Sequence, residues 1–121
     1  MPNRPQVLIV EDDPHVRTAL ADLLDAEGYE CDLAANGADA INMLEGPHHP
    51  CVVLVDLLMP GVVGQELIEY LRGDARLSAI PVAILSASPQ LAPPGYRVFR
   101  KPLELGLLLE FLRESLAGSV A

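Results

Sequence analysis

Three continuous apolar runs, each four or five residues long, alternate along the chain with longer segments of mixed polarity. They cover residues 7–10, 51–55 and 82–85 and are rich in valine, leucine and isoleucine. Short apolar runs of this kind are typical of strands that are covered on both faces, as in a parallel sheet. Residues 29–34 indicate another strand, and a last short strand is expected just before Lys101 and Pro102. The pattern therefore predicts five strands.

Apolar residues at helical spacing lie in the segments between these strands. The first predicted helical face is made of Val16, Leu20, Leu23 and Leu24. Asp13 is the expected N-cap of this helix, Pro14 its first residue and Gly28 its stop signal. Two further helices are expected over residues 38–44 and 65–71.

The last helix is predicted over residues 103–116. Its apolar face comprises Leu105, Leu108, Leu109, Phe111, Leu112 and Leu116. Strands that alternate with helices along a whole chain imply right-handed crossovers between parallel strands. We therefore expect a single α/β domain over residues 1–121, with a five-stranded parallel sheet between two layers of helices. Ligands of such sheets bind at the carboxyl ends of the strands.

The composition narrows the range of functions. Of the 121 residues, 50% are hydrophobic and 21% are charged, which favours a folded domain over a disordered chain. The formal charge is −9, from 17 acidic and 8 basic residues, and this excess disfavours binding to nucleic-acid backbones or anionic lipid. No apolar stretch approaches the roughly 20 residues that cross a bilayer, and no secretory signal opens the chain. We expect a cytoplasmic protein with no direct nucleic-acid or membrane binding.

Polar side chains follow four of the predicted strands at their carboxyl ends. They are Glu11, Asp12, Asp56, Ser86 and Lys101. Because parallel strands end at one edge of a sheet, we expect these side chains to converge on one pocket. Clustered carboxylates repel one another at neutral pH, and their oxygens suit a hard cation, Mg²⁺ or Mn²⁺. The lysine ammonium and the serine hydroxyl beside them suit a phosphoryl oxygen.

Asp56 differs from the other carboxylates because it ends an apolar strand and precedes a further apolar segment, residues 57–61. This placement suits a nucleophile. A carboxylate can attack a phosphoryl donor to form an acyl phosphate, while a metal ion and Lys101 neutralise the charge of the transition state.

From Val7 to Leu116 the chain resembles the receiver domain of bacterial two-component response regulators. The resemblance rests on Val10-Glu11-Asp12, on Asp56 with Met59-Pro60-Gly61 after it, on Ser86-Ala87, and on Lys101-Pro102. It implies a flavodoxin-like (βα)5 fold of strand order 2-1-3-4-5. It also implies a phosphoryl group received, with Mg²⁺, from a histidine kinase or a histidine phosphotransfer domain. Such a domain catalyses only its own phosphorylation and dephosphorylation and is no turnover enzyme.

The same resemblance assigns roles to individual residues. Asp56 would be the phosphoacceptor, and Ser86 and Lys101 would hold the phosphoryl oxygens. The groups at the metal would be Asp12, Asp56 and the backbone carbonyl of Leu58, with Glu11 acting through metal-bound water.

The segment between Ser86 and Lys101 departs from the family. Only residues 87–100 separate the two, and they include Pro89, Pro93, Pro94 and Gly95. We therefore expect the fourth helix to be shortened or absent. In the family, an aromatic residue three positions before the lysine takes part in the switch with the serine. That position is Val98 here, with Phe99 next to it, so we expect an atypical output face, with a homodimer or a downstream protein as its partner.

Three other functions fit parts of the pattern. A phosphorylation-independent docking module on a degenerate receiver fold would leave the pocket unused, and a phosphorylation assay discriminates it. A small Mg²⁺-dependent phosphohydrolase resembling the haloacid dehalogenases would need a second aspartate two residues after Asp56, where Leu58 stands. A flavin carrier of similar fold would need a phosphate-binding loop after the first strand, where the acidic residues would repel the phosphate.

Overall fold

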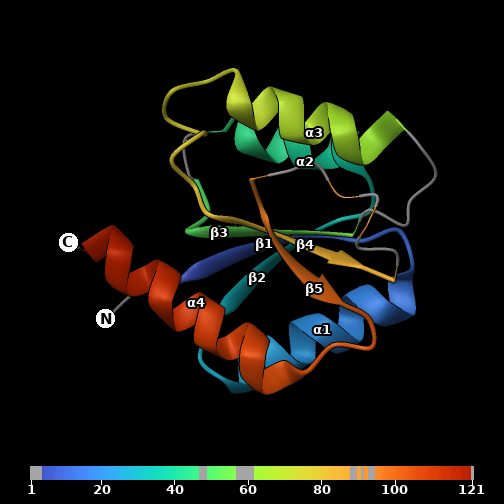
Figure 1. The fold of residues 1–121 in the computed structure, drawn as a ribbon, viewed down its shortest axis with the longest axis vertical. Coiled ribbons are helices and arrows are strands. Elements are labelled where there is room, and N and C mark those ends of the chain that lie inside the picture. Colours follow the sequence, from blue (N-terminus) through green and yellow to red (C-terminus); the bar gives the residue numbers. More distant parts are fainter. Residues whose placement is uncertain are drawn as a thin grey trace.

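A computed structural model describes residues 4–46, 49–56, 62–87, 90, 92 and 95–120, and for residues 62–65 and 117–120 it describes the backbone only. Strands and helices alternate as far as β4. The elements are β1 (Gln6–Val10), α1 (Pro14–Ala26), β2 (Glu30–Ala34), α2 (Gly37–Leu44), β3 (Val52–Asp56), α3 (Val62–Arg72), β4 (Val82–Ser86), β5 (Arg97–Arg100) and α4 (Leu105–Val120). Figure 1 shows the sheet between two helical layers, with α2 and α3 on one face and α1 and α4 on the other.

The five strands form one parallel sheet in the order β2-β1-β3-β4-β5, which confirms the predicted order 2-1-3-4-5 and the flavodoxin-like class. The register aligns the carboxyl ends of the strands. Val10 lies opposite Val55, so the acidic residues after β1 lie beside Asp56 at the end of β3. Asp56 lies opposite Leu85, and Ser86 lies opposite Arg100, the residue before Lys101.

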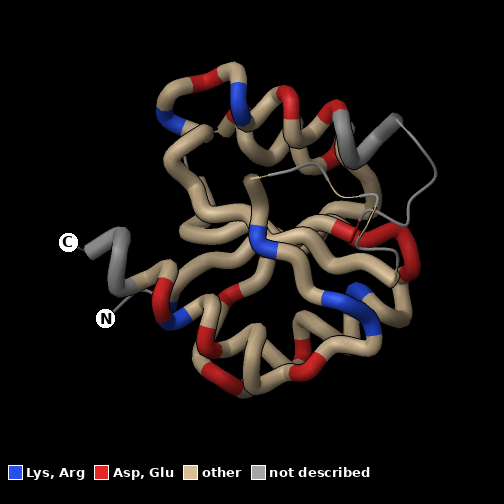
Figure 2. The backbone as a smooth tube through the Cα atoms, in the orientation of Figure 1, with Lys and Arg blue, Asp and Glu red and all other residues tan. Residues whose placement is uncertain are grey.

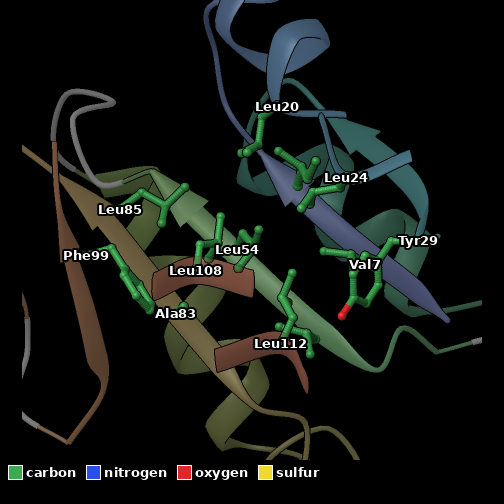
Figure 3. Close-up of a cluster of buried hydrophobic side chains, with 12 residues drawn as sticks. Val7, Leu20, Leu24, Tyr29, Leu54, Ala83, Leu85, Phe99, Leu108 and Leu112 are labelled. Atoms are coloured by element: carbon green, nitrogen blue, oxygen red, sulfur yellow. The ribbon is translucent and has the colours of Figure 1, made fainter. Parts of the chain in front are cut away.

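The strands bury side chains on both faces, as their continuous apolar runs predict. One buried cluster lies toward α1 and α4 and includes Leu54, Ala83, Phe99, Leu108 and Leu112, which Figure 3 shows together. The other lies toward α2 and α3 and contains the alternate residues of the same strands, such as Val53 and Val55. These two clusters fix the sheet between its helices and so hold the strand ends in place.

Helix α1 begins and ends as predicted, but its apolar face is narrower. Asp13 is the N-cap, and its carboxylate accepts hydrogen bonds from the backbone N–H groups of residues 15 and 16. Leu20 and Leu24 are buried, whereas Val16 and Leu23 are 41% and 47% exposed, so only part of the predicted apolar face is buried. They lie at the rim of the helix and line a surface groove together with Leu20.

No α-helix lies between β4 and β5 in the residues described there, which confirms the prediction of a shortened or absent fourth helix. Pro89, Pro93 and Pro94 lie outside the described residues. Where the chain enters β5, the Tyr96 hydroxyl accepts a hydrogen bond of 2.7 Å from Nε of Arg72, whose guanidinium also lies over the Tyr96 ring. This contact joins the end of α3 to the start of β5.

Helix α4 begins two residues later than predicted, at Leu105, because the Glu104 carbonyl accepts the N–H groups of residues 107 and 108 and so starts the helical pattern. The start of β1 and the described end of α4 lie on the same side of the molecule, away from the carboxyl ends of the strands (Figure 1). Near the first of them, Arg4 bonds to the Asp25 carboxylate and to the Tyr29 carbonyl. No helix among the described residues has the length and apolar character needed to span a membrane.

Candidate functional site

Three carboxylates meet where β1 and β3 end. Glu11, Asp12 and Asp56 can each offer one oxygen so that all three lie within 4.8 Å of one another. Glu11 and Asp56 are 4% and 2% exposed, whereas Asp12 faces solvent. The site therefore has two carboxylates in the protein interior and one at its opening.

Lys101 supplies the positive charge of this site. Its Nζ lies 2.8 Å from Oδ2 of Asp56 and 3.4 Å from Oε1 of Glu11. Burial opposes the charge of the ammonium, but its hydrogen bond to Asp56 and the charges of both carboxylates outweigh burial and raise the pKa of Lys101. Lys101 therefore stays protonated at neutral pH and bridges the two buried carboxylates.

Glu11 is the carboxylate whose negative charge this site disfavours. Burial, followed by the hydrogen bond and the charge that it shares with Asp56, raises the pKa of Glu11 to about 7. The N–H of Asp13 donates to its carboxylate at 3.2 Å and partly offsets this effect. A divalent cation would remove the repulsion, since one ammonium cannot neutralise three carboxylates. Hard oxygen donors with one side open to water are the donor set that Mg²⁺ takes, so the residues present fit this ion.

Arg17 is a residue of this site that the sequence patterns did not single out. Its Nη1 donates a hydrogen bond of 2.7 Å to the backbone carbonyl of Glu11. The N–H of Glu11 donates to the carbonyl of Ala34 in β2, so the backbone is fixed on both sides of this residue. A basic residue one turn into the helix that follows an acidic strand end was the available signal.

The remaining predicted residues have different placements. Ser86 ends β4 with 2% exposure, and its carbonyl accepts the backbone N–H of Lys101 at 3.0 Å, so the two residues are adjacent at the sheet edge. Leu58 lies outside the described residues. Val98 is half-buried opposite Ile84 in β4. Phe99 is buried in the cluster toward α4, where its ring meets that of Phe111 edge to face at 5.6 Å.

Comparison with known proteins gives consistent results. The family model of the response regulator receiver domain matches residues 7–93, so β5 and α4 lie beyond the match. Protein PilH of Pseudomonas aeruginosa is 34% identical over 120 residues, which are 93% of this chain and 98% of PilH. Response regulator Rre1 of Synechocystis is 40% identical over 83 residues, 67% of this chain, and the chain spans only 35% of Rre1.

A solved structure shows the same likeness. The signal receiver domain of a signal transduction histidine kinase from Syntrophus aciditrophicus has a TM-score of 0.81 and 29% sequence identity, with 94% of this chain and 91% of that chain covered. Receiver domains are signalling modules and not conventional turnover enzymes. On the match of the family model and the near full-length similarity to PilH, the chain belongs to the response regulator receiver domain family.

Proposed function

We propose that this chain accepts a phosphoryl group on Asp56 from a phosphohistidine of a histidine kinase or histidine phosphotransfer domain. The observation that carries the proposal is the geometry around Asp56: a buried carboxylate 2.8 Å from the Lys101 ammonium and grouped with Glu11 and Asp12. An oxygen of Asp56 bonds to phosphorus while the P–N bond to the donor imidazole breaks, and the leaving imidazole takes up a proton. The product is an acyl phosphate.

Each neighbouring residue has a part in this transfer. Asp12, Asp56 and the Leu58 carbonyl would hold Mg²⁺, with Glu11 nearby, and the ion would neutralise the phosphoryl oxygens. Lys101 turns from its two carboxylates to a phosphoryl oxygen, a short movement for a flexible side chain that already contacts Asp56. The Ser86 hydroxyl, at the end of the neighbouring strand, binds another oxygen of the bound phosphoryl group.

An apolar groove beside the site supports docking of the donor. It has a volume of about 320 Å³ and lies between α1 and the segment that follows β5, with Val16, Leu23 and Leu103 in its walls and Lys101 at its edge. An amphipathic helix of a partner would bury its apolar face in such a groove. Its nearness to Lys101 would bring a phosphohistidine on that helix toward Asp56. The encounter would take place in the cytoplasm.

In our proposal, the conformational response to phosphorylation differs from that of the family. Phosphorylation adds charge beside Ser86 and Lys101 and shifts the balance between two arrangements of the surrounding segments. The family position for a switching aromatic holds Val98, whose side chain is short. Phe99 cannot take its place without leaving Phe111 and the buried cluster. The signal would thus leave through the backbone around Ser86 and β5.

A docking module without phosphoryl chemistry is the less favoured function. Two buried carboxylates and a lysine ammonium are costly to desolvate, and apolar residues of similar volume would be at least as stable. The presence of all three groups, together with Asp12, therefore favours a site that performs phosphoryl transfer.

Intact-protein mass spectrometry with acetyl phosphate as donor tests the proposal. We expect a single phosphoryl adduct that requires Mg²⁺ and disappears in Asp56→Asn. Asp22→Asn, which changes an exposed aspartate of α1, is the matched control and should keep the adduct. If no adduct forms from acetyl phosphate or from a histidine kinase while calorimetry shows bound Mg²⁺, the docking module replaces this proposal.

A further inference from the structure

Strand β5 is one edge of the sheet, and part of its backbone faces outward. The N–H of Lys101 donates to Ser86 of β4, and backbone groups alternate in direction along a strand. The N–H and C=O groups of Arg97 and Phe99 therefore also point toward β4, while those of Val98 and Arg100 point to the open side. No described strand pairs with that side. Such an edge is a template for an added strand.

A groove runs along this open edge. It has a volume of about 400 Å³, with β5 as one wall and, opposite, Leu107 of α4 and the Glu104 carboxylate just before that helix. The Arg97 guanidinium lies 4.8 Å from the centre of the Phe99 ring, a cation–π contact that holds its position. The groove thus combines backbone hydrogen-bonding groups, a fixed arginine and apolar surface.

The charge of this edge contrasts with that of the whole chain. Three of the eight basic residues lie within residues 97–101, although the formal charge of the chain is −9. Figure 2 shows basic positions along β5 and acidic positions over much of the helical surface. Arg4 and Arg76 have carboxylate partners, whereas within the described part of the chain neither Arg97 nor Arg100 has one.

We propose that the open edge of β5 binds an acidic, extended segment of another protein as a sixth strand of the sheet. The Val98 and Arg100 backbone would pair with the added strand, and the two arginines would pair with its carboxylates. A second copy of this chain is a poorer occupant, because pairing of β5 with itself would bring the arginines of both copies together. The proposal goes beyond phosphoryl acceptance and does not depend on it.

Selection from a phage-displayed library of short random peptides, with the full chain as bait and no Mg²⁺ or phosphodonor, tests this surface. We expect the selected peptides to alternate acidic with β-branched residues. Their binding should protect the amides of Val98 and Arg100 from hydrogen exchange in NMR spectra. The double variant R97E/R100E should lower the affinity at least about tenfold, while R76E/R113E, with the same charge change on exposed arginines outside the groove, should keep it.

Three results would overturn the proposal. One is selection of peptides without acidic residues, and another is equal affinity for R97E/R100E. The third is protection of amides elsewhere in place of Val98 and Arg100, which would indicate a helix-binding or apolar surface. Asp56→Asn should bind the selected peptides as the native chain does, so failure here is separable from failure of phosphoryl acceptance.

Discussion

Two charged regions of this molecule differ in whether their charges are paired. They are the carboxyl edge of the sheet and the open side of β5. At the carboxyl edge, Lys101 is enclosed with Glu11 and Asp56 and satisfies them. One residue earlier, Arg100 is exposed and has no carboxylate partner among the described residues. Neighbours in sequence thus serve opposite purposes, because successive side chains of an extended backbone point to opposite sides.

This contrast indicates which part of a receiver domain can vary. The acidic site needs four strand ends in register and so depends on the whole sheet. The open edge needs only β5 and the absence of a covering segment. A chain can therefore change the crossover before β5 and alter its surface there while the site stays intact. The following predictions test this separation, starting with the largest effect.

Removal of the Lys101 ammonium should affect the site most. In Lys101→Gln we expect the rate of phosphorylation from acetyl phosphate to fall by about a hundredfold or more, because a positive group is lost at the developing charge. Lys101→Arg should keep part of the rate. Quench-flow or timed mass spectrometry measures both, with thermal melting in Mg²⁺ as the control for folding. An unchanged rate in Lys101→Gln would show that the lysine has no part in the transfer.

The two faces of β5 should respond unequally to truncation. Phe99→Ala removes a ring that is 7% exposed and should lower the free energy of unfolding by about 3 kcal/mol, through lost burial and a cavity. Val98→Ala, at a half-buried position, should cost about 1 kcal/mol or less. Urea titrations measure both. Phosphorylation of Asp56 should persist in each variant, and its loss in Val98→Ala at full stability would give Val98 a part in the transfer itself.

Stability without Mg²⁺ should depend on pH through Glu11. Its pKa rises from 4.5 to about 7 on folding, so the folded state binds the extra proton. The stabilisation is complete below pH 4.5 and is lost as the pH rises to about 7, with an upper bound of about 3 kcal/mol for this shift. Glu11→Gln should flatten this part of the urea-midpoint profile, as should saturating Mg²⁺. A profile that stays unchanged in Glu11→Gln would assign the dependence to another group.

The sequence predicted most of the site because its members sit at strand ends. Continuous apolar runs define those ends sharply, so Glu11, Asp56 and Lys101 could be grouped before any coordinates. The short connection after Ser86, rich in proline, likewise predicted a shortened or absent helix, and no α-helix lies among its described residues. These signals are local in sequence, and each has a direct physical cause. Proline removes a backbone donor, and a parallel strand requires cover on both faces.

Other features depend on packing that a periodic pattern does not contain. Val16 and Leu23 have the spacing of core residues, yet they line a surface groove. Helical periodicity specifies which side of the helix a residue is on, but not how far the neighbouring elements extend to cover that side. Arg17 was missed because its partner is a backbone carbonyl, so only its place one turn into the helix after an acidic strand end could have indicated it. The roles of Leu58, Ser86, Val98 and Phe99 in transfer and switching stay predictions.

The start of β1 and the described end of α4 lie on the side of the sheet away from the carboxyl ends of the strands (Figure 1), and this has a practical consequence for labelling. A fluorescent protein fused beyond either of them would leave Asp56 and the groove beside α1 accessible to a partner. Arg4, bonded to Asp25 and Tyr29, would anchor the N-terminal fusion to the body of the domain. A pair of fluorophores at the two ends would then serve as an internal distance reference, against which a third label on β5 could report its movement.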